Sequence, residues 1–288
     1  MLLATRMRID VHTHTFPARI ARSALEKLQR MSGTKLFSDG TNEGLRRQMT
    51  QAGLDYAVIQ PVATDARQVP HINDSAIRIN GQALQTGILS FGCMHPDYEE
   101  PETELFRLAD AGVRGIKLHP PYQGADMDDP RYLRILDAAG ACGLAVLIHA
   151  GLDVGLPGIN SSTPKKLLRA LRAVGPVTLI LAHMGGWRCW EQAEALLAGT
   201  GVYLDTSFSL GLLPTIRDDI SREELQMLTD EQFVRMVHAF GAKHVLFGSD
   251  SPWSDQSAEL HKVLDLPLTE EEKQAILGGN AAALLGIA

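Results

Sequence analysis

The sequence IDVHTH at residues 9–14 joins a short apolar run to two histidines. Successive side chains of an extended strand point to opposite faces, so residues two apart share a face. His12 and His14 therefore lie side by side at the end of a strand predicted over 7–14. Two imidazoles in that arrangement can bind one divalent metal ion together.

Later hydrophobic runs also end in a potential metal ligand: His95, His119, His149, His183 and Asp250. A histidine at the end of a strand buried on both sides costs free energy unless its nitrogens find partners. One such residue could be a hydrogen-bonded core histidine, but this many predict a shared site. His95 is the exception, because the Pro-Asp that follows it fits a turn as well as a substrate contact.

The runs that carry these residues alternate with segments of helical periodicity, about eight times over. The predicted strands are 7–14, 56–61, 88–95, 115–119, 145–149, 178–183, 202–206 and 244–250. The predicted helices include 19–31, 73–86, 101–111, 130–142, 164–174, 187–198 and 230–240, with a last short helix over 281–285 capped by Asn280. This pattern predicts an α/β fold, a (β/α)₈ TIM barrel that forms a single domain over residues 1–288.

Composition narrows the classes of partner. The net charge of −7 gives no basic surface for nucleic acid, and no stretch approaches the roughly 20 apolar residues that cross a bilayer. We therefore expect a small-molecule substrate, no nucleic-acid or membrane partner and a cytoplasmic location. The protein could also form a homo-oligomer, which the sequence does not decide.

Zinc and similar ions favour imidazole nitrogen and carboxylate oxygen, and a catalytic site leaves a position open for water. His12, His14, His149, His183 and Asp250 supply that ligand set. Considered alone, Asp250 would be interpreted as the residue that caps the start of a helix. The closure of a barrel, however, makes its last strand a neighbour of its first, which favours the ligand interpretation.

Several motifs together resemble the amidohydrolase superfamily, and specifically its amidohydrolase-2 branch of TIM-barrel metal-dependent hydrolases. They are HTH at 12–14, GIKLHP at 115–120, the strand ends at His149 and His183, and FGSDSPW at 247–253. The likeness extends over essentially the whole chain, down to GNAAALLG at 279–286.

The resemblance implies one or two divalent ions, zinc first and manganese as an alternative. The implied ligands are His12, His14 and Asp250, with His149 as a further ligand. His183 is implied either as a ligand to a second ion or as the residue that polarises the substrate. Bound metal lowers the pKa of water, and Asp250 would accept the proton and pass it to the leaving group.

Lys117 bears on the number of ions. In two-metal members of the superfamily a lysine of the fourth strand is carboxylated and bridges the ions, and Lys117 occupies that strand with His119 on the same face. The alternatives are an unmodified Lys117 paired with a carboxylate, and a His119 that hydrogen-bonds the substrate. Tyr122 and Trp253 follow the fourth and eighth strands and are tentative substrate-binding residues, with ordinary loop packing as the alternative.

The resemblance implies a metal-dependent hydrolase of a small-molecule amide, ester or lactone. The same branch contains nonoxidative decarboxylases of aromatic or unsaturated acids, which form the main alternative. A histidinol-phosphatase-like phosphoesterase is more distant, because those barrels follow the Gly-Ser-Asp with Ala-His where this chain has Ser251-Pro252. The remaining class is a barrel that has lost catalysis and serves as a binding module, and the intact set of ligand residues argues against it.

Overall fold

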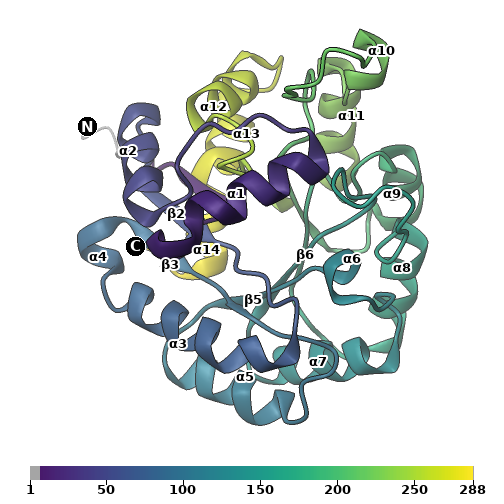
Figure 1. The fold of residues 1–288 in the computed structure, drawn as a ribbon. Helices are drawn as coiled ribbons and strands as arrows, with labels where there is room; N and C mark the ends of the chain where they lie inside the picture. The colour runs from purple at the N-terminus through teal and green to yellow at the C-terminus, as the bar shows by residue number, and fades with distance from the viewer. Residues whose placement is uncertain (1–6, 288) are drawn as a thin grey trace, which may run out of the picture. The chain divides into compact units, whose positions relative to one another are not determined.

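The structure is a computed structural model that describes residues 7–287 as alternating strands and helices (Figure 1). It divides into two compact units. The first combines the chain up to Val58 with the chain from Asp205 onward, and the second spans Ile59–Leu204. The prediction of a single domain over residues 1–288 stays a prediction.

The second unit contains a parallel sheet. Within this unit the sheet consists of β4 (Gly92–Cys93), β5 (Gly115–Leu118), β6 (Ala145–Ile148), β7 (Leu179–Leu181) and the start of β8 (Tyr203–Asp205). The unit also contains β3 (Ile88–Ser90), which is not part of this sheet. Strands β4 to β8 pair in chain order and in parallel, with Lys117 in register with Cys93 on one side and with Leu147 on the other. Near-continuous apolar runs suit such strands because both of their faces are covered.

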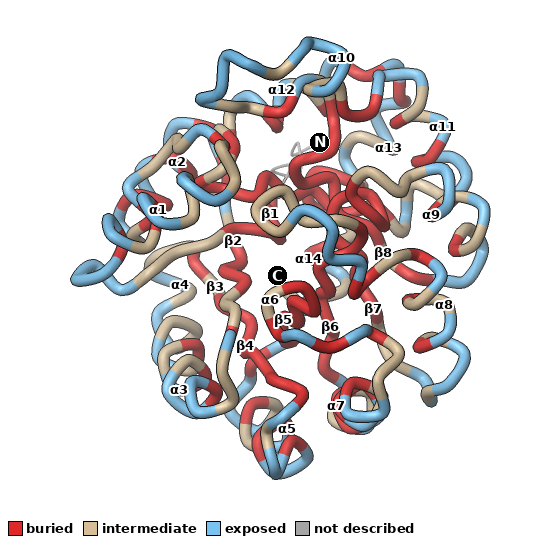
Figure 2. Tube along the Cα trace, turned by 45° about the vertical axis from the view of Figure 1, so that its right-hand side comes forward, coloured by how far each residue is buried: buried red, intermediate tan, exposed pale blue. Residues whose placement is uncertain are grey.

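Helices connect these strands. They are α3 (Val69–Asn80), α4 (Ala83–Thr86), α5 (Pro101–Asp110), α6 (Pro120–Gln123), α7 (Pro130–Ala141), α8 (Pro164–Ala173) and α9 (Trp190–Leu197). Four of them start with proline, whose fixed φ and missing N–H suit the first helical turn. Figure 2 shows β5 and β6 buried along their length, whereas buried and more exposed residues alternate along α3, α5 and α7.

The first unit brings the two ends of the chain together around β1 (Ile9–Thr13). The Val11 N–H donates to the Phe247 carbonyl at 2.8 Å, and the Asp250 N–H donates to the His12 carbonyl at 2.8 Å. The segment after β9 (Val245–Leu246) therefore runs beside the histidine pair. The Thr206 N–H donates to the Leu246 carbonyl at 3.0 Å, so the residues after β8 also lie beside β9.

The remaining elements of this unit are helices and a strand that pairs with β1. They are α1 (Ala18–Ser32), α2 (Asn42–Ala52), β2 (Tyr56–Ile59), α10 (Arg222–Leu225), α11 (Asp230–Phe240), α12 (Gln256–Asp265), α13 (Glu270–Gln274) and α14 (Asn280–Leu285). A π-helical turn at Ala275–Gly279 joins the last two. Within residues 7–287 no helix combines the length and the apolar composition needed to cross a membrane.

The α/β class is confirmed, and each predicted strand is present in shorter form. The third strand is interrupted at Phe91, and helix α2 was not predicted. The cap assigned to Asn280 is wrong: Asn280 is the first residue of α14, and its side-chain amide donates to the carbonyls of Ala242 and Val245 at 2.8 Å each.

Candidate metal centre

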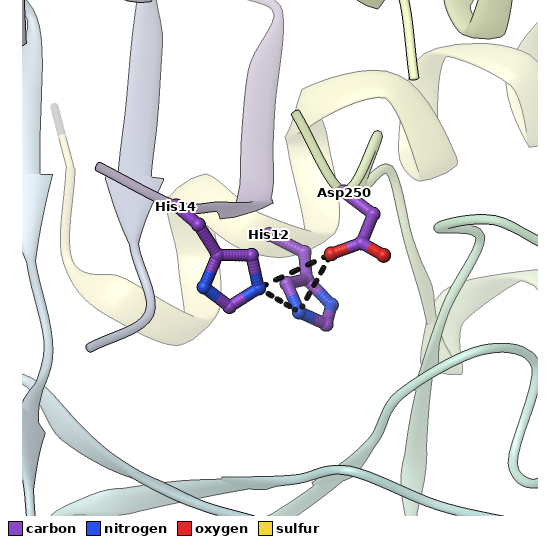
Figure 3. A group of neighbouring side chains, drawn as sticks. All are labelled: His12, His14 and Asp250. Carbon is purple, nitrogen blue, oxygen red and sulfur yellow. Dashed lines mark hydrogen bonds and ion pairs between the residues drawn. The ribbon is translucent and has the colours of Figure 1, made fainter. Parts of the chain in front are cut away.

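His12, His14 and Asp250 converge in the first unit (Figure 3). His12 Nε2 lies 3.2 Å from His14 Nε2 and 3.5 Å from Asp250 Oδ1. His14 Nε2 lies 3.1 Å from the same carboxylate oxygen. His12 is 1% exposed and Asp250 is 8% exposed, so the three groups meet in a largely dehydrated setting.

These distances fit a bound divalent ion. Donor atoms placed 2.0–2.1 Å from a tetrahedral zinc lie roughly 3.3 Å from one another. The three measured separations, 3.1, 3.2 and 3.5 Å, bracket that value. Two imidazoles and one carboxylate are also the donor types of catalytic zinc sites, so the residues present fit the metal that the sequence implies.

The backbone at Asp250 supports a role for its side chain. Its φ is +65°, a left-handed conformation that a residue other than glycine adopts at a cost of about 1–3 kcal/mol. A helix-cap role does not explain it, because the cap of α12 is Asp255, whose carboxylate accepts from the Ala258 N–H. The strained backbone aims the Asp250 carboxylate at the two imidazoles (Figure 3).

Behind His12 lies a second carboxylate that the sequence analysis missed. His12 Nδ1 is 2.8 Å from Asp205 Oδ2 and 3.0 Å from Ser207 Oγ. Ser207 in turn donates to Asp205 Oδ1 from Oγ at 2.5 Å and from its N–H at 3.0 Å. Asp205 follows the apolar residues of the strand predicted over 202–206, as the histidines follow theirs, which is a signal that could have identified it.

Asp10, also missed, fastens the strand that carries the histidines. Its carboxylate accepts from Ser249 Oγ at 2.5 Å, the Ser249 N–H at 3.0 Å, Gln256 Nε2 at 2.7 Å and the His12 N–H at 3.1 Å. Complete burial raises the pKa of Asp10 to about 7, although these hydrogen bonds act in the opposite direction. The network joins β1, the segment before Asp250 and the start of α12.

The second unit holds a separate group of potential ligands at the carboxyl ends of β5 and β6: His119, His149 and Asp153. Asp153 Oδ2 lies 3.5 Å from His119 Nε2 and 3.7 Å from His149 Nε2. The two imidazole rings stack with centroids 4.1 Å apart. Asp153 lies in the loop after β6, where no periodic pattern pointed to it.

The hydrogen bonds of His149 make this second group a poorer fit for an ion. His149 Nε2 is 3.0 Å from the Leu152 carbonyl, which can only accept, so this nitrogen carries the proton. The lone pair is then on Nδ1, which faces His183 Nε2 at 3.1 Å. Burial, and next His119, His183 and Lys117, hold the pKa of His149 well below its usual range, so the ring is neutral.

The other predicted site residues are placed as follows. Lys117 is buried on β5, and Tyr122 packs edge-on against His119 with ring centroids 4.6 Å apart. His183 has a left-handed backbone with φ of +59°. Trp253, in the first unit, is half-buried, and its N–H donates to the Asp250 carbonyl at 2.9 Å. His95 stabilises its own turn, because its Nδ1 accepts from the Asp97 N–H at 3.1 Å.

Three solved structures show the fold. A 5-carboxyvanillate decarboxylase from Sphingomonas paucimobilis is 17% identical with a TM-score of 0.68, covering 99% of this chain and 100% of its own. An uncharacterised TIM-barrel protein from Bordetella bronchiseptica is 17% identical with a TM-score of 0.74, and the alignment covers 97% of this chain and 98% of the Bordetella chain. A candidate 2-pyrone-4,6-dicarboxylic acid hydrolase from Pseudomonas putida is 21% identical with a TM-score of 0.66, covering 98% of each chain.

These similarities confirm the predicted TIM-barrel fold. Among curated proteins no sequence matches the chain. The family model described as "Amidohydrolase" matches residues 9–287, which include both histidines of the IDVHTH stretch and Asp250. The chain therefore belongs to the amidohydrolase family.

Proposed function

We propose that the protein is a metal-dependent hydrolase of a small-molecule amide, ester or lactone, with the metal held by His12, His14 and Asp250. One observation carries the proposal: three donor atoms of the preferred types converge within 3.1–3.5 Å of one another. We expect zinc as the ion, with manganese as the alternative, because imidazole and carboxylate accommodate both.

A divalent ion bound there would act as a Lewis acid toward the substrate and lower the pKa of water. Asp250 contributes a second function in this proposal. Both of its contacts to the imidazoles use Oδ1, and Oδ2 points away from them (Figure 3). Oδ2 is therefore suited to accept a proton from the attacking water and to deliver it to the leaving group.

For the second unit we propose substrate handling. The buried His119 and the half-buried Tyr122 form an edge-to-face pair that can contact and hydrogen-bond a small polar substrate. His183 donates to His149 Nδ1 in the tautomer described above, so the two rings hold each other in place. That His149 and His183 are ligands, that Lys117 is carboxylated and that Trp253 binds substrate stay predictions.

Nonoxidative decarboxylation is a second candidate. The solved structures with this fold include a 5-carboxyvanillate decarboxylase and a 2,6-dihydroxybenzoate decarboxylase, beside the candidate pyrone hydrolase. The amidohydrolase family is thus compatible with both reactions on a similar fold. An electron-rich aromatic acid is the substrate class that this alternative requires.

The test supplies the purified full chain with Zn²⁺ or Mn²⁺ and a panel of substrates. The panel holds 2-pyrone-4,6-dicarboxylate and simple lactones, esters and amides on one side, and 5-carboxyvanillate and 2,6-dihydroxybenzoate on the other. We expect hydrolysis on the first side, measured by pH-stat for the lactones and esters and by release of the amine for the amides, and no carbon dioxide on the second. Carbon dioxide released without any hydrolysis product would replace the hydrolase proposal by the decarboxylase.

The control uses matched histidine variants. His12→Asn and His14→Asn should abolish turnover, because each removes a metal ligand. His71→Asn changes an exposed histidine of α3 and should leave turnover at the wild-type level. Equal activity in all three variants would contradict the assignment of the site.

A further inference from the structure

We infer that Asp205, held by Ser207, positions His12 for metal binding by fixing which of its ring nitrogens carries the proton. The inference rests on the proposed function and extends it to two residues outside the predicted ligand set. Both residues follow or close β8 and lie in the same unit as His12. Asp205 and Ser207 are fully buried, and His12 is 1% exposed.

The contact between Asp205 and His12 determines the tautomer. An ionised carboxylate can only accept hydrogen bonds, so at 2.8 Å from Asp205 Oδ2 the His12 Nδ1 must be the protonated nitrogen. A neutral imidazole has one N–H, and its lone pair then lies on Nε2. Nε2 is the atom that faces His14 Nε2 and Asp250 Oδ1, at 3.2 and 3.5 Å.

Ser207 keeps the carboxylate in this orientation. Asp205 Oδ1 receives two hydrogen bonds from Ser207, at 2.5 Å from Oγ and at 3.0 Å from N–H, which leaves Oδ2 directed at His12. In a buried setting such charge-assisted hydrogen bonds are stronger than in water. A carboxylate behind a metal-binding imidazole also raises the basicity of the opposite nitrogen, and removal of such a partner weakens metal binding.

The first test needs neither metal nor activity. ¹⁵N NMR of the histidine side chains in the metal-free protein should show His12 as the Nδ1–H tautomer, with the signal assigned by its loss in His12→Asn. In Asp205→Asn an amide N–H can face Nδ1 and stabilise the Nε2–H form, so the signal should shift toward that tautomer. A wild-type His12 in the Nε2–H form overturns the inference.

The second test measures the dissociation constant for Zn²⁺ by competition with a chelator. Asp205→Asn should weaken binding by ~10- to 100-fold, the usual effect of losing such a partner. Ser207→Ala keeps the carboxylate and removes one of its donors, so we expect a smaller loss of ~3- to 10-fold. Asp218→Asn, at an exposed aspartate of the same unit, should bind like wild type.

Several outcomes separate this inference from the proposed function. If wild type binds no Zn²⁺, the proposed function fails, whereas the NMR tautomer still decides the role of Asp205. If Asp205→Asn does not fold, Ser207→Ala and the wild-type spectrum carry the test. Unchanged Zn²⁺ affinity in both variants overturns the inference. It is also overturned if each variant loses Zn²⁺ affinity only in proportion to its loss of thermal stability without metal, because that would indicate a merely structural role.

Discussion

At the scale of single residues, the candidate centre depends on which atom of each side chain is turned toward the others. His12 lies on β1 and His14 directly follows the strand, and both present Nε2 to the candidate centre. Asp250 reaches them from a left-handed backbone, with φ of +65°. A strained backbone of this kind persists where the surrounding structure holds it, which is common at functional sites.

Asp250→Asn tests the dual role of this carboxylate. The substitution preserves size and removes both the negative charge and the capacity to accept a proton. With saturating Zn²⁺ and a substrate from the panel, we expect kcat/KM to fall by ~100- to 10,000-fold. Asp265→Asn, at an exposed position of α12, is the matched control and should retain full activity. A loss under tenfold in Asp250→Asn would show that Asp250 does not transfer the proton.

The residues that sequence reasoning identified are those with a periodic signal. His12 and His14 share a face by strand geometry, and Asp250 ends a hydrophobic run, so all three could be placed near strand ends. Asp205 ends a hydrophobic run too, but a lone carboxylate there carried no second signal. Asp153 depends on the conformation of a loop, which no pattern encodes.

At the scale of elements, Asp10 connects β1 with the segment before Asp250 and with α12. Its partners Ser249 and Gln256 are both fully buried. Four hydrogen bonds on one buried carboxylate fix the position of the strand that carries the histidines relative to the strand end that carries Asp250. The site is therefore held together by a polar network as well as by apolar packing.

Gln256→Ala tests this network away from the candidate ligands. The variant removes the 2.7 Å hydrogen bond to Asp10. Hydrogen bonds to charged groups contribute about 1.5–3 kcal/mol, so the free energy of unfolding should fall by about that amount when it is measured in urea at a pH well above the Asp10 pKa of about 7, where the carboxylate is ionised. Gln85→Ala, at an exposed position of α4, should change stability little. Equal stability of both variants would show that the network is dispensable.

The elements themselves followed from periodicity to different degrees. The buried parallel strands have no polar face, so their continuous apolar runs were readily identified. Helix α2 was missed because its stretch NEGLRRQMTQA carries few apolar residues, and its buried face includes Gly44 and Gln48. Strands β7 and β9 are shorter than predicted, although Ala182 and Phe247, directly after them, still make backbone hydrogen bonds to neighbouring segments.

At the scale of the whole molecule, the alternation of strands and helices was sufficient to predict the barrel. The match of the family over residues 9–287 agrees with it. Specificity was beyond reach, because it depends on loop conformations after the strands rather than on the repeated pattern.

The number of ions is also a property of the whole chain. The family resemblance implies His149 as a further ligand and leaves open whether one ion or two are bound. A single shared ion would give one equivalent of Zn²⁺ per chain, lost in His14→Asn and in His149→Asn alike. Two independent ions would give two equivalents, one of them lost in each variant.

The most direct measurement is the binding of Zn²⁺ to the metal-free full chain, followed by chelator competition for wild type, His14→Asn and His71→Asn. We expect tight binding by wild type and by His71→Asn. Because His14→Asn removes a ligand itself, we expect its binding to be weakened by more than the ~10- to 100-fold that loss of a ligand's hydrogen-bond partner causes. Equal affinity of all three proteins, or no binding by wild type, would contradict the claim that His12, His14 and Asp250 form a metal centre.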